Sequence, residues 1–189
     1  NLQEAELSTR KAIKLNPGFA IANYNLGNIL RDLGNLQEAE LSTRKAIKLN
    51  PYFTNAYFNL FRHYEETNNL KKLEISLKEF SNIDIIENEI FLFRARLSYR
   101  NKEYIMAKNL INMISSQWIK KINKDEKVIF WSYKGFIEDK IENYDIAYSC
   151  FEKSQEDYSF FRLNKDSYLN MINSYKKSII NKKTVLSEF

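Results

Sequence analysis

The chain has 189 residues, of which 44% are hydrophobic, 14% aromatic and 28% charged. This composition excludes a disordered chain, which has few aromatic residues and a large net charge, and four glycines and two prolines are too few for the turns of an all-β protein. The net charge of +5 is concentrated in the tail, where six Lys or Arg stand against two Asp or Glu from Arg162 onward, so the rest of the chain lacks the basic face of a nucleic-acid-binding protein.

The single cysteine and the hydropathy pattern bear on the compartment. Cys150 alone cannot form an internal disulfide framework, which indicates a reducing environment. No apolar run approaches the roughly 20 residues of a membrane-spanning helix, and no secretory leader is visible. We therefore expect a cytoplasmic protein that does not bind a membrane.

The main feature is an internal repeat. Residues 1–17, NLQEAELSTRKAIKLNP, recur letter for letter as residues 35–51, at an offset of 34, which indicates duplication. A 34-residue period with a Leu26-Gly27 pair, a later alanine and a terminal Pro51 resembles the tetratricopeptide repeat. The resemblance implies an all-α solenoid of antiparallel helix pairs, wound into a right-handed superhelix whose concave wall comes mainly from the first helix of each pair, helix A.

The complete repeat, residues 20–53, predicts helix A over 21–33 and the second helix, helix B, over 36–49. Gly34 provides a left-handed residue between them. Asn35 is expected to cap helix B together with Glu38, three residues later, as in a capping box. Asn50-Pro51 ends helix B, because a residue before proline is displaced from the α region.

The repeat frame also predicts where paired helices touch. Helices that approach within about 8–10 Å need small residues at the contact. The contact position reads Gly27, Phe61, Ala95 and Gly135 on helix A, and Ala5, Ala39, Leu73, Ala107 and Ala147 on helix B. The third repeat is large at both positions, so its helices must lie further apart or lean differently.

The same frame predicts the domain organisation. We expect a repeat array over residues 1–160, consisting of a half repeat over 1–19 and repeats near 20–53, 54–87, 88–125 and 126–160. Six additional residues around Trp118 predict a longer helix or loop, with Trp118 packed on a neighbouring helix or, alternatively, contacting a partner. Residues 161–189 are expected to form a capping or linker helix and a tail, with an apolar face made by Tyr168, Met171, Ile172, Tyr175 and Ile179.

The resemblance implies a non-catalytic scaffold whose concave groove binds a protein or an extended peptide segment. The groove positions of the family correspond here to Tyr24, Asn25, Asn28, Arg31, Phe58, Asn59, Arg62, Phe93, Arg96 and Tyr133. Aromatic, arginine and asparagine side chains provide apolar anchors, carboxylate partners and amides for backbone groups.

Two family comparisons refine this expectation. The carboxylate clamp of chaperone-binding repeats is rejected, because Tyr24, Glu89 and Phe93 occupy the places of its basic residues. Asn25 and Asn59 resemble rungs of the asparagine ladder of O-linked N-acetylglucosamine transferase, which Phe93 and Tyr133 interrupt. The alternative is that these asparagines are solvated polar residues on a helix face.

No residue pattern is typical of catalysis. His63 is the only histidine, so we expect neither a metal-binding histidine pair nor a nucleophile–base relay. We expect His63 to lie on the surface or between helices. Cys150 is expected to pack against its surroundings, and the pairs Glu65-Glu66 and Glu138-Asp139 to be solvated. We expect no catalytic residue, no cofactor and no metal in this chain.

Two further hypotheses concern what lies outside the repeats. Residues 164–180 resemble the helix that follows the repeats in bacterial sulfotransferase fusions, which implies, as an alternative function, the substrate-recognition arm of a multidomain sulfotransferase. The first repeat begins in the turn before its helix B, so a fragment is expected. The face that its missing helix A would cover also predicts self-association.

Overall fold

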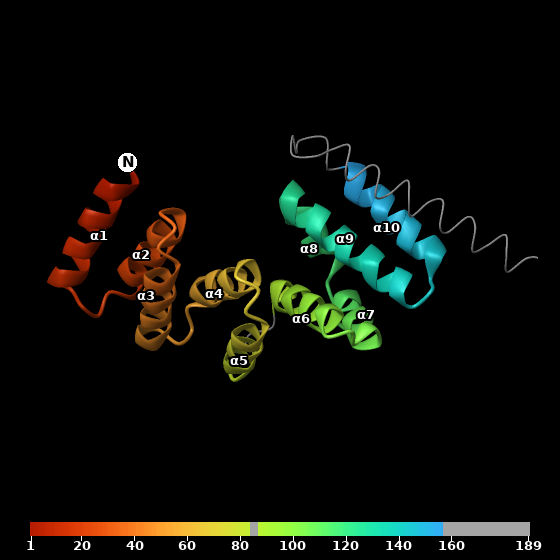
Figure 1. The fold of residues 1–189 in the computed structure, drawn as a ribbon, viewed down its shortest axis with the longest axis horizontal. Coiled ribbons are helices and arrows are strands. Elements are labelled where there is room, and N and C mark those ends of the chain that lie inside the picture. Colours follow the sequence, from red (N-terminus) through yellow and green to blue (C-terminus); the bar gives the residue numbers. More distant parts are fainter. Residues whose placement is uncertain (84–86, 157–189) are drawn as a thin grey trace, which may run out of the picture. The chain divides into compact units, whose positions relative to one another are not determined.

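The structure, a computed structural model, describes residues 1–83 and 87–156. Within these ranges the chain forms ten α-helices and no strand, which confirms the predicted all-α class. The helices fall into two compact units, divided between residues 86 and 87, and each unit is described by itself (Figure 1). The capping helix predicted over 161–189, with its apolar face, lies outside the described residues.

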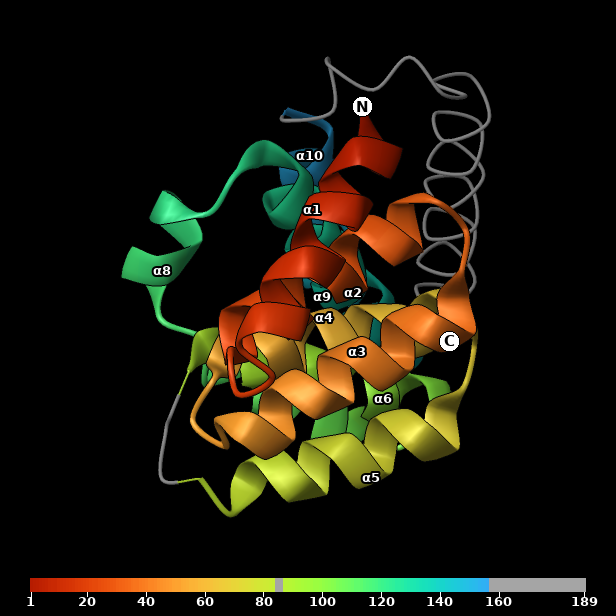
Figure 2. The ribbon, with the colours of Figure 1, turned by 90° about the vertical axis from the view of Figure 1, so that its left-hand side faces the viewer.

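The first unit contains α1 (Leu2–Leu15), α2 (Ala20–Asp32), α3 (Leu36–Leu49), α4 (Thr54–Glu66) and α5 (Leu70–Ser81). Each helix packs on the next one along the chain. In Figure 2, the helix B elements α1, α3 and α5 follow one another from top to bottom. The predicted helices over 21–33 and 36–49 are α2, which begins and ends one residue earlier, and α3.

The turn between the helices of each pair repeats one backbone conformation. Gly34 has a φ of +82°, as predicted. The residues at the same place in the later pairs are Asn68, Lys102 and Glu142, and these also have positive φ, between 53° and 66°. The turn is therefore retained even where a side chain makes the left-handed conformation unfavourable.

The predicted capping box at Asn35 is wrong. The Asn35 side chain makes no capping hydrogen bond. The carboxylate of Glu38 instead accepts a hydrogen bond from Arg10 of α1, with 2.6 Å between Oε1 and Nη2. A capping box does occur at Asn123 and Glu126, where α9 begins.

The predicted contact positions are buried, except Ala5 of α1, which is half-buried. Ala39 is 3% exposed, and Ala107 and Ala147 are fully buried. A Cβ atom added to Gly27 would overlap the Thr43 side chain of α3, and one added to Gly135 would lie 2.5 Å from the Phe151 ring. Small side chains therefore permit the close approach of the paired helices, as the repeat frame predicted.

The third repeat fills its contact with large side chains. Phe61 and Leu73 are both fully buried. The Phe61 ring lies 6.1 Å from the ring of Phe80 on α5 and 6.2 Å from that of Tyr57. Aromatic packing thus replaces the close backbone approach between α4 and α5.

Two helices of identical sequence show what a neighbouring helix contributes. Both α1 and α3 read LQEAELSTRKAIKL. α3 packs against α2 and α4 and buries Ala39, Ser42, Thr43 and Ala46, whereas α1 packs against α2 and buries no residue. The difference in burial comes from the neighbours, since the sequences are the same.

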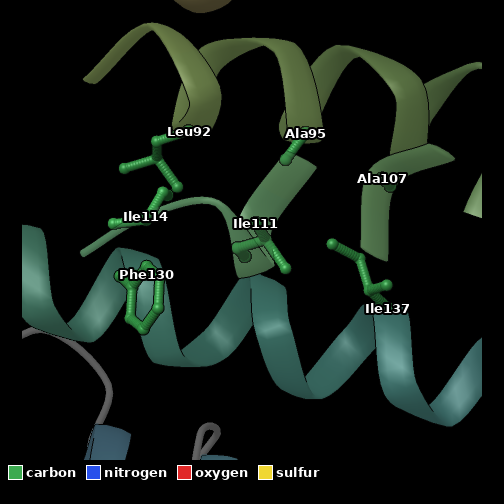
Figure 3. Packing of buried hydrophobic residues seen from close by; sticks show 7 residues of the cluster. All are labelled: Leu92, Ala95, Ala107, Ile111, Ile114, Phe130 and Ile137. Atoms are coloured by element: carbon green, nitrogen blue, oxygen red, sulfur yellow. The ribbon is translucent and has the colours of Figure 1, made fainter. Parts of the chain in front are cut away.

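The second unit contains α6 (Asn88–Arg100), α7 (Tyr104–Asn112), α8 (Ser116–Lys121), α9 (Lys124–Lys140) and α10 (Tyr144–Glu156). Its core joins α6, α7 and α9 through the residues shown in Figure 3, namely Leu92, Ala95, Ala107, Ile111, Ile114, Phe130 and Ile137. The additional residues predicted around Trp118 form the short helix α8. Trp118 is half-buried and packs against this core, which confirms the packing interpretation.

Candidate functional site

The predicted groove residues divide between the two units. In the first unit, α2 carries Tyr24, Asn25, Asn28 and Arg31, and α4 carries Phe58, Asn59 and Arg62. In the second unit, α6 carries Phe93 and Arg96, and α9 carries Tyr133.

An asparagine pair joins α2 to α4. The amide nitrogen of Asn59 donates a hydrogen bond to the side-chain oxygen of Asn28. Asn59 is 9% exposed and Asn28 is half-buried. Among the described residues, the amide nitrogen of Asn28 and the side-chain oxygen of Asn59 have no hydrogen-bond partner, which leaves an NH2 group and a carbonyl oxygen available.

The other predicted residues of the first unit have different environments. Asn25 and Arg62 are exposed, and the half-buried Tyr24 lies with its ring 4.9 Å from that of Phe53. Arg31 is half-buried and forms an ion pair with Asp32 at 3.3 Å. Phe58 departs from the prediction. It is 5% exposed with its ring 6.0 Å from that of Phe80, so it is a core residue and does not line a surface.

The structure brings the three residues of the second unit together as a stack. The Arg96 guanidinium lies over the Tyr133 ring at 5.0 Å and over the Phe93 ring at 5.6 Å. Such cation–π contacts contribute about 0.5–2 kcal/mol. Phe93 is 5% exposed, so this arrangement stabilises the packing of α6 on α9 and presents little of the Phe93 ring to a ligand.

A small pocket lies between α2, α3 and α4. Its internal space of about 10 Å³ is close to the size that one water molecule requires. The pocket is lined by Gly27, Asn28 and Arg31 of α2, by Ala39, Glu40 and Thr43 of α3, and by Asn59, Leu60 and His63 of α4. Three of the predicted groove residues, Asn28, Arg31 and Asn59, therefore surround one pocket.

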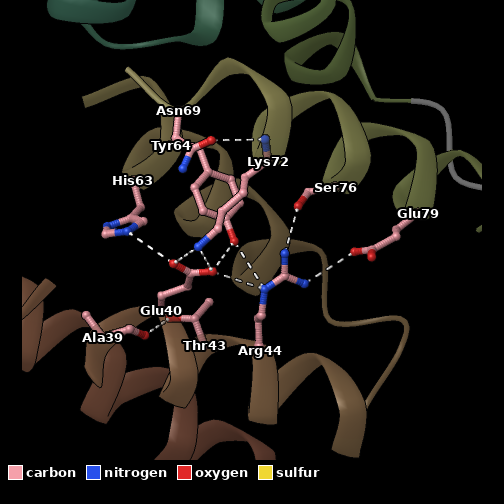
Figure 4. Close-up of polar contacts among 10 residues, drawn as sticks. All are labelled: Ala39, Glu40, Thr43, Arg44, His63, Tyr64, Asn69, Lys72, Ser76 and Glu79. Carbon is pink, nitrogen blue, oxygen red and sulfur yellow. Dashed lines mark hydrogen bonds and ion pairs between the residues drawn. The ribbon is translucent and has the colours of Figure 1, made fainter. Parts of the chain in front are cut away.

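A polar cluster that the sequence did not predict borders this pocket (Figure 4). The Glu40 carboxylate accepts a hydrogen bond from the Tyr64 hydroxyl at 2.7 Å and hydrogen bonds from the Lys72 ammonium at 2.9 Å to both oxygens. Arg44 lies 3.4 Å from the same carboxylate. The His63 Nε2 atom lies 3.9 Å from Glu40 Oε2. We call Glu40, Arg44, His63, Tyr64 and Lys72 the Glu40 cluster.

The cluster determines the protonation of its members. Burial raises the pKa of Glu40, but the hydrogen bonds from Tyr64 and Lys72 outweigh burial and hold that pKa below its ordinary value. Burial, together with the hydrogen bond to Glu40, raises the pKa of Tyr64 far above the ordinary tyrosine value. Burial lowers the pKa of His63 more than Glu40 raises it. At neutral pH the cluster therefore contains an ionised carboxylate and a neutral imidazole.

A pattern in the repeat could have indicated this cluster. The i, i+4 pair Glu6–Arg10 recurs as Glu40–Arg44. At the positions of His63 and Tyr64, the preceding repeat has Ile29 and Leu30. The signal is a polar pair that replaces two apolar residues of a repeat, next to an ion pair that recurs in the chain.

The solvated role expected for two acidic residues is wrong. Glu138 is 2% exposed and accepts hydrogen bonds from Asn143 at 2.7 Å and from Lys108 of α7 at 3.3 Å. Glu65 is 8% exposed. Glu138 joins α7 to α9, a role that the spacing of charges along one helix does not reveal.

Other chemistry-bearing groups have packing roles. Cys150 is buried, and burial raises the pKa of its thiol, so the thiol stays protonated at neutral pH. Within residues 1–83 and 87–156 no three His, Cys, Asp or Glu residues are grouped so as to hold a metal ion. No helix among these residues is both long and apolar enough to span a bilayer.

The His63 environment predicts a pH dependence of stability. The pKa of His63 is lower in the folded protein than its ordinary value of 6.5. Below pH 6.5 the unfolded chain therefore binds more protons than the folded protein does, and the stabilisation present above that pH is lost as the pH falls. Urea unfolding at pH 7.5 and pH 5.5 should show lower stability at pH 5.5. The lowered pKa of Glu40 keeps that carboxyl ionised over this range. His63→Gln should reduce the difference, and an equal loss in the variant would contradict the assignment.

Comparisons with known proteins agree with this architecture. The family described as tetratricopeptide repeat matches residues 20–53. No curated protein matches the chain. Among solved structures, a chain of the APC/C hetero-tetramer Cut9–Hcn1 is 16% identical with a TM-score of 0.76, covering 95% of this chain and 34% of that one. This chain therefore spans about a third of that relative.

Two other solved structures match over a larger share of their own chains. A tetratricopeptide repeat protein from Parabacteroides merdae is 20% identical, with a TM-score of 0.70, covering 99% of this chain and 73% of that chain. YrrB, described as a TPR protein with an unusual peptide-binding site, is 14% identical, with a TM-score of 0.56, covering 88% of this chain and 90% of that chain. At such identities the likeness establishes the fold alone.

Proposed function

Residues 20–53 are a tetratricopeptide repeat and the chain has the tetratricopeptide solenoid fold, and from this premise we propose that it binds an extended protein or peptide segment along α2 and α4. The fold is a scaffold for protein and peptide binding in general. The proposal adds that the segment lies over the pair Asn28–Asn59 and is held mainly by hydrogen bonds to its backbone.

The observation that carries the proposal is the asparagine pair. The hydrogen bond between Asn28 and Asn59 fixes both amides and leaves the NH2 group of Asn28 and the side-chain oxygen of Asn59 available. A peptide backbone offers one N–H donor and one C=O acceptor per residue, so the pair matches a backbone of any sequence. Asn25, exposed on α2, provides a further amide. YrrB, with its peptide-binding site, supports peptide binding as a use of this fold.

Substitution of the asparagines tests this role. Peptides selected on the wild-type protein from a phage-displayed random library serve as probes, and their affinities are measured by calorimetry. Asn25→Ala, Asn28→Ala and Asn59→Ala should each weaken binding about fivefold to tenfold, the effect of losing one hydrogen bond.

A matched control separates binding from folding. Gln37 is exposed on α3 and lines no part of the pocket, so Gln37→Ala should leave the affinity unchanged. Equal affinities for the asparagine variants and the control would refute the groove. Thermal melts of all four variants establish that each remains folded.

Self-association through α1 is a second candidate with an observation of its own. α1 exposes Ser8, whereas its counterpart Ser42 in the identical helix α3 is 8% exposed. A helix from a second molecule could cover this face of α1 as its neighbours cover α3. Light scattering that gives the monomer mass at every concentration would exclude this candidate.

The sulfotransferase hypothesis stays a prediction without support from the described residues. It requires a reading frame that continues beyond Phe189 into a phosphate-binding loop. Sequencing the flanking region tests it, and a stop codon directly after Phe189 would end it.

A further inference from the structure

The pocket between α2, α3 and α4 is lined by His63, a buried side chain whose nearest charged neighbour is the Glu40 carboxylate. His63 is 8% exposed, and its Nε2 atom lies 3.9 Å from Glu40 Oε2, beyond hydrogen-bond distance. Among the described residues, no hydrogen bond reaches the His63 ring. The imidazole and the Glu40 carboxylate can therefore both form a hydrogen bond with a polar group that enters the pocket.

The geometry limits what can fill this space. A single oxygen atom that lies to one side of the line joining His63 Nε2 and Glu40 Oε2, about 2.8 Å from each, is within hydrogen-bond reach of both atoms. The remaining wall is small or apolar, with Gly27, Ala39 and Leu60. The internal space of the pocket is close to that of one water molecule, which matches the size of a hydroxyl group.

The charges select among small groups. Glu40 is ionised, so a carboxylate or a phosphate group placed beside it would be repelled. A lysine or arginine side chain would meet the positive charges of Arg44 and Lys72, which already neutralise Glu40. A hydroxyl satisfies both neighbours, because it donates to the Glu40 carboxylate and accepts from the imidazole N–H.

We propose that this pocket receives a serine or threonine side chain of the segment bound along α2 and α4, with its hydroxyl between His63 and Glu40. The inference rests on the proposed peptide-binding function and adds a side-chain specificity to it. The asparagine amides hold the backbone of the bound segment whatever its sequence is. The pocket adds a preference for serine or threonine at one position of that segment.

The pocket also sets the register of the segment. In the repeat frame, the residue that corresponds to His63 is Ile29 in the preceding pair and Leu97 in the next. Neither of these side chains can hydrogen-bond to a hydroxyl. Along α2 and α4, a segment therefore meets the His63–Glu40 pair beside α4 and an apolar side chain at the same place of the preceding pair, and its hydroxyl residue is fixed beside His63.

The test uses the peptides selected from the phage-displayed random library. The tightest binders should share a serine or threonine at one position. Replacing that residue by alanine, or threonine by valine, should weaken binding to the wild-type protein about tenfold, because the hydroxyl bonds to a charged group. No common hydroxyl residue, a preference for aspartate or glutamate, or an unchanged affinity after the alanine substitution would overturn the inference.

Two variants separate this inference from the proposed function. On His63→Leu, or on His63→Gln if the leucine variant fails to fold, the serine peptide and its alanine version should bind within about twofold of each other. Asn25 does not line the pocket, so Asn25→Ala should weaken both peptides and retain the preference for serine. If the asparagine variants weaken binding while the serine and alanine peptides bind alike, peptide binding along α2 and α4 is supported and the hydroxyl specificity of the pocket is refuted. If the library gives no peptide that binds the wild-type protein, both the proposed peptide binding and the hydroxyl specificity are refuted.

Discussion

Replacing Ala39 by tryptophan is expected to lower the free energy of unfolding by about 1–3 kcal/mol or more. Ala39 is 3% exposed on α3, and its carbonyl lies 3.2 Å from the place of a Cβ atom on Gly27. A larger side chain must push α3 away from α2. Urea unfolding followed by circular dichroism measures the loss.

The chain contains a matched control for this change. Ala5 occupies the same place in α1, a helix of identical sequence, but is only half-buried. Ala5→Trp should therefore cost distinctly less than Ala39→Trp. Similar losses for both variants would mean that helix propensity, and not the packing of α2 on α3, determines the effect.

Phe61→Ala is expected to have a still larger effect, about 3–5 kcal/mol, because it leaves a cavity in an aromatic core. Phe61 is fully buried on α4, between the rings of Tyr57, Phe58 and Phe80. The same repeat position holds Gly27 on α2, where a side chain would overlap Thr43. At this repeat position, the pair α2–α3 requires a small residue, whereas a small residue would destabilise the pair α4–α5.

An exposed aromatic residue provides the comparison for Phe61. Tyr52 is 72% exposed in the turn before α4, so Tyr52→Ala should change stability by less than about 0.5 kcal/mol. Calorimetric unfolding of both variants measures the difference. A loss below about 1 kcal/mol for Phe61→Ala would contradict the aromatic packing described for α4 and α5.

The sequence predicted the features that depend on neighbours along the chain. The helix bounds of α2 and α3, the left-handed Gly34 and the buried alanines follow from a period of 34 and from side-chain size. Features that depend on a third helix were not predicted. The Glu40 cluster joins α3, α4 and α5, and Phe58 enters the core because α5 packs over it.

The helices α1 and α3 show why such features escape sequence analysis. The two have the same 14 residues, yet α3 has four buried residues and α1 has none. The same limit applies to the site. Asn28 and Asn59 could be assigned to one face from their repeat positions, but the hydrogen bond between them and the place of His63 in the pocket depend on how α2 and α4 approach each other.

The most direct test of the central claim is nuclear magnetic resonance of the labelled protein during titration with a selected peptide. Binding along α2 and α4 predicts that the side-chain amide signals of Asn28 and Asn59 shift together with the ring signals of His63. Leu41 and Ile75 are 68% and 53% exposed on α3 and α5, and their signals should stay in place. Shifts confined to Leu41 and Ile75, with the asparagine amides unchanged, would contradict the account.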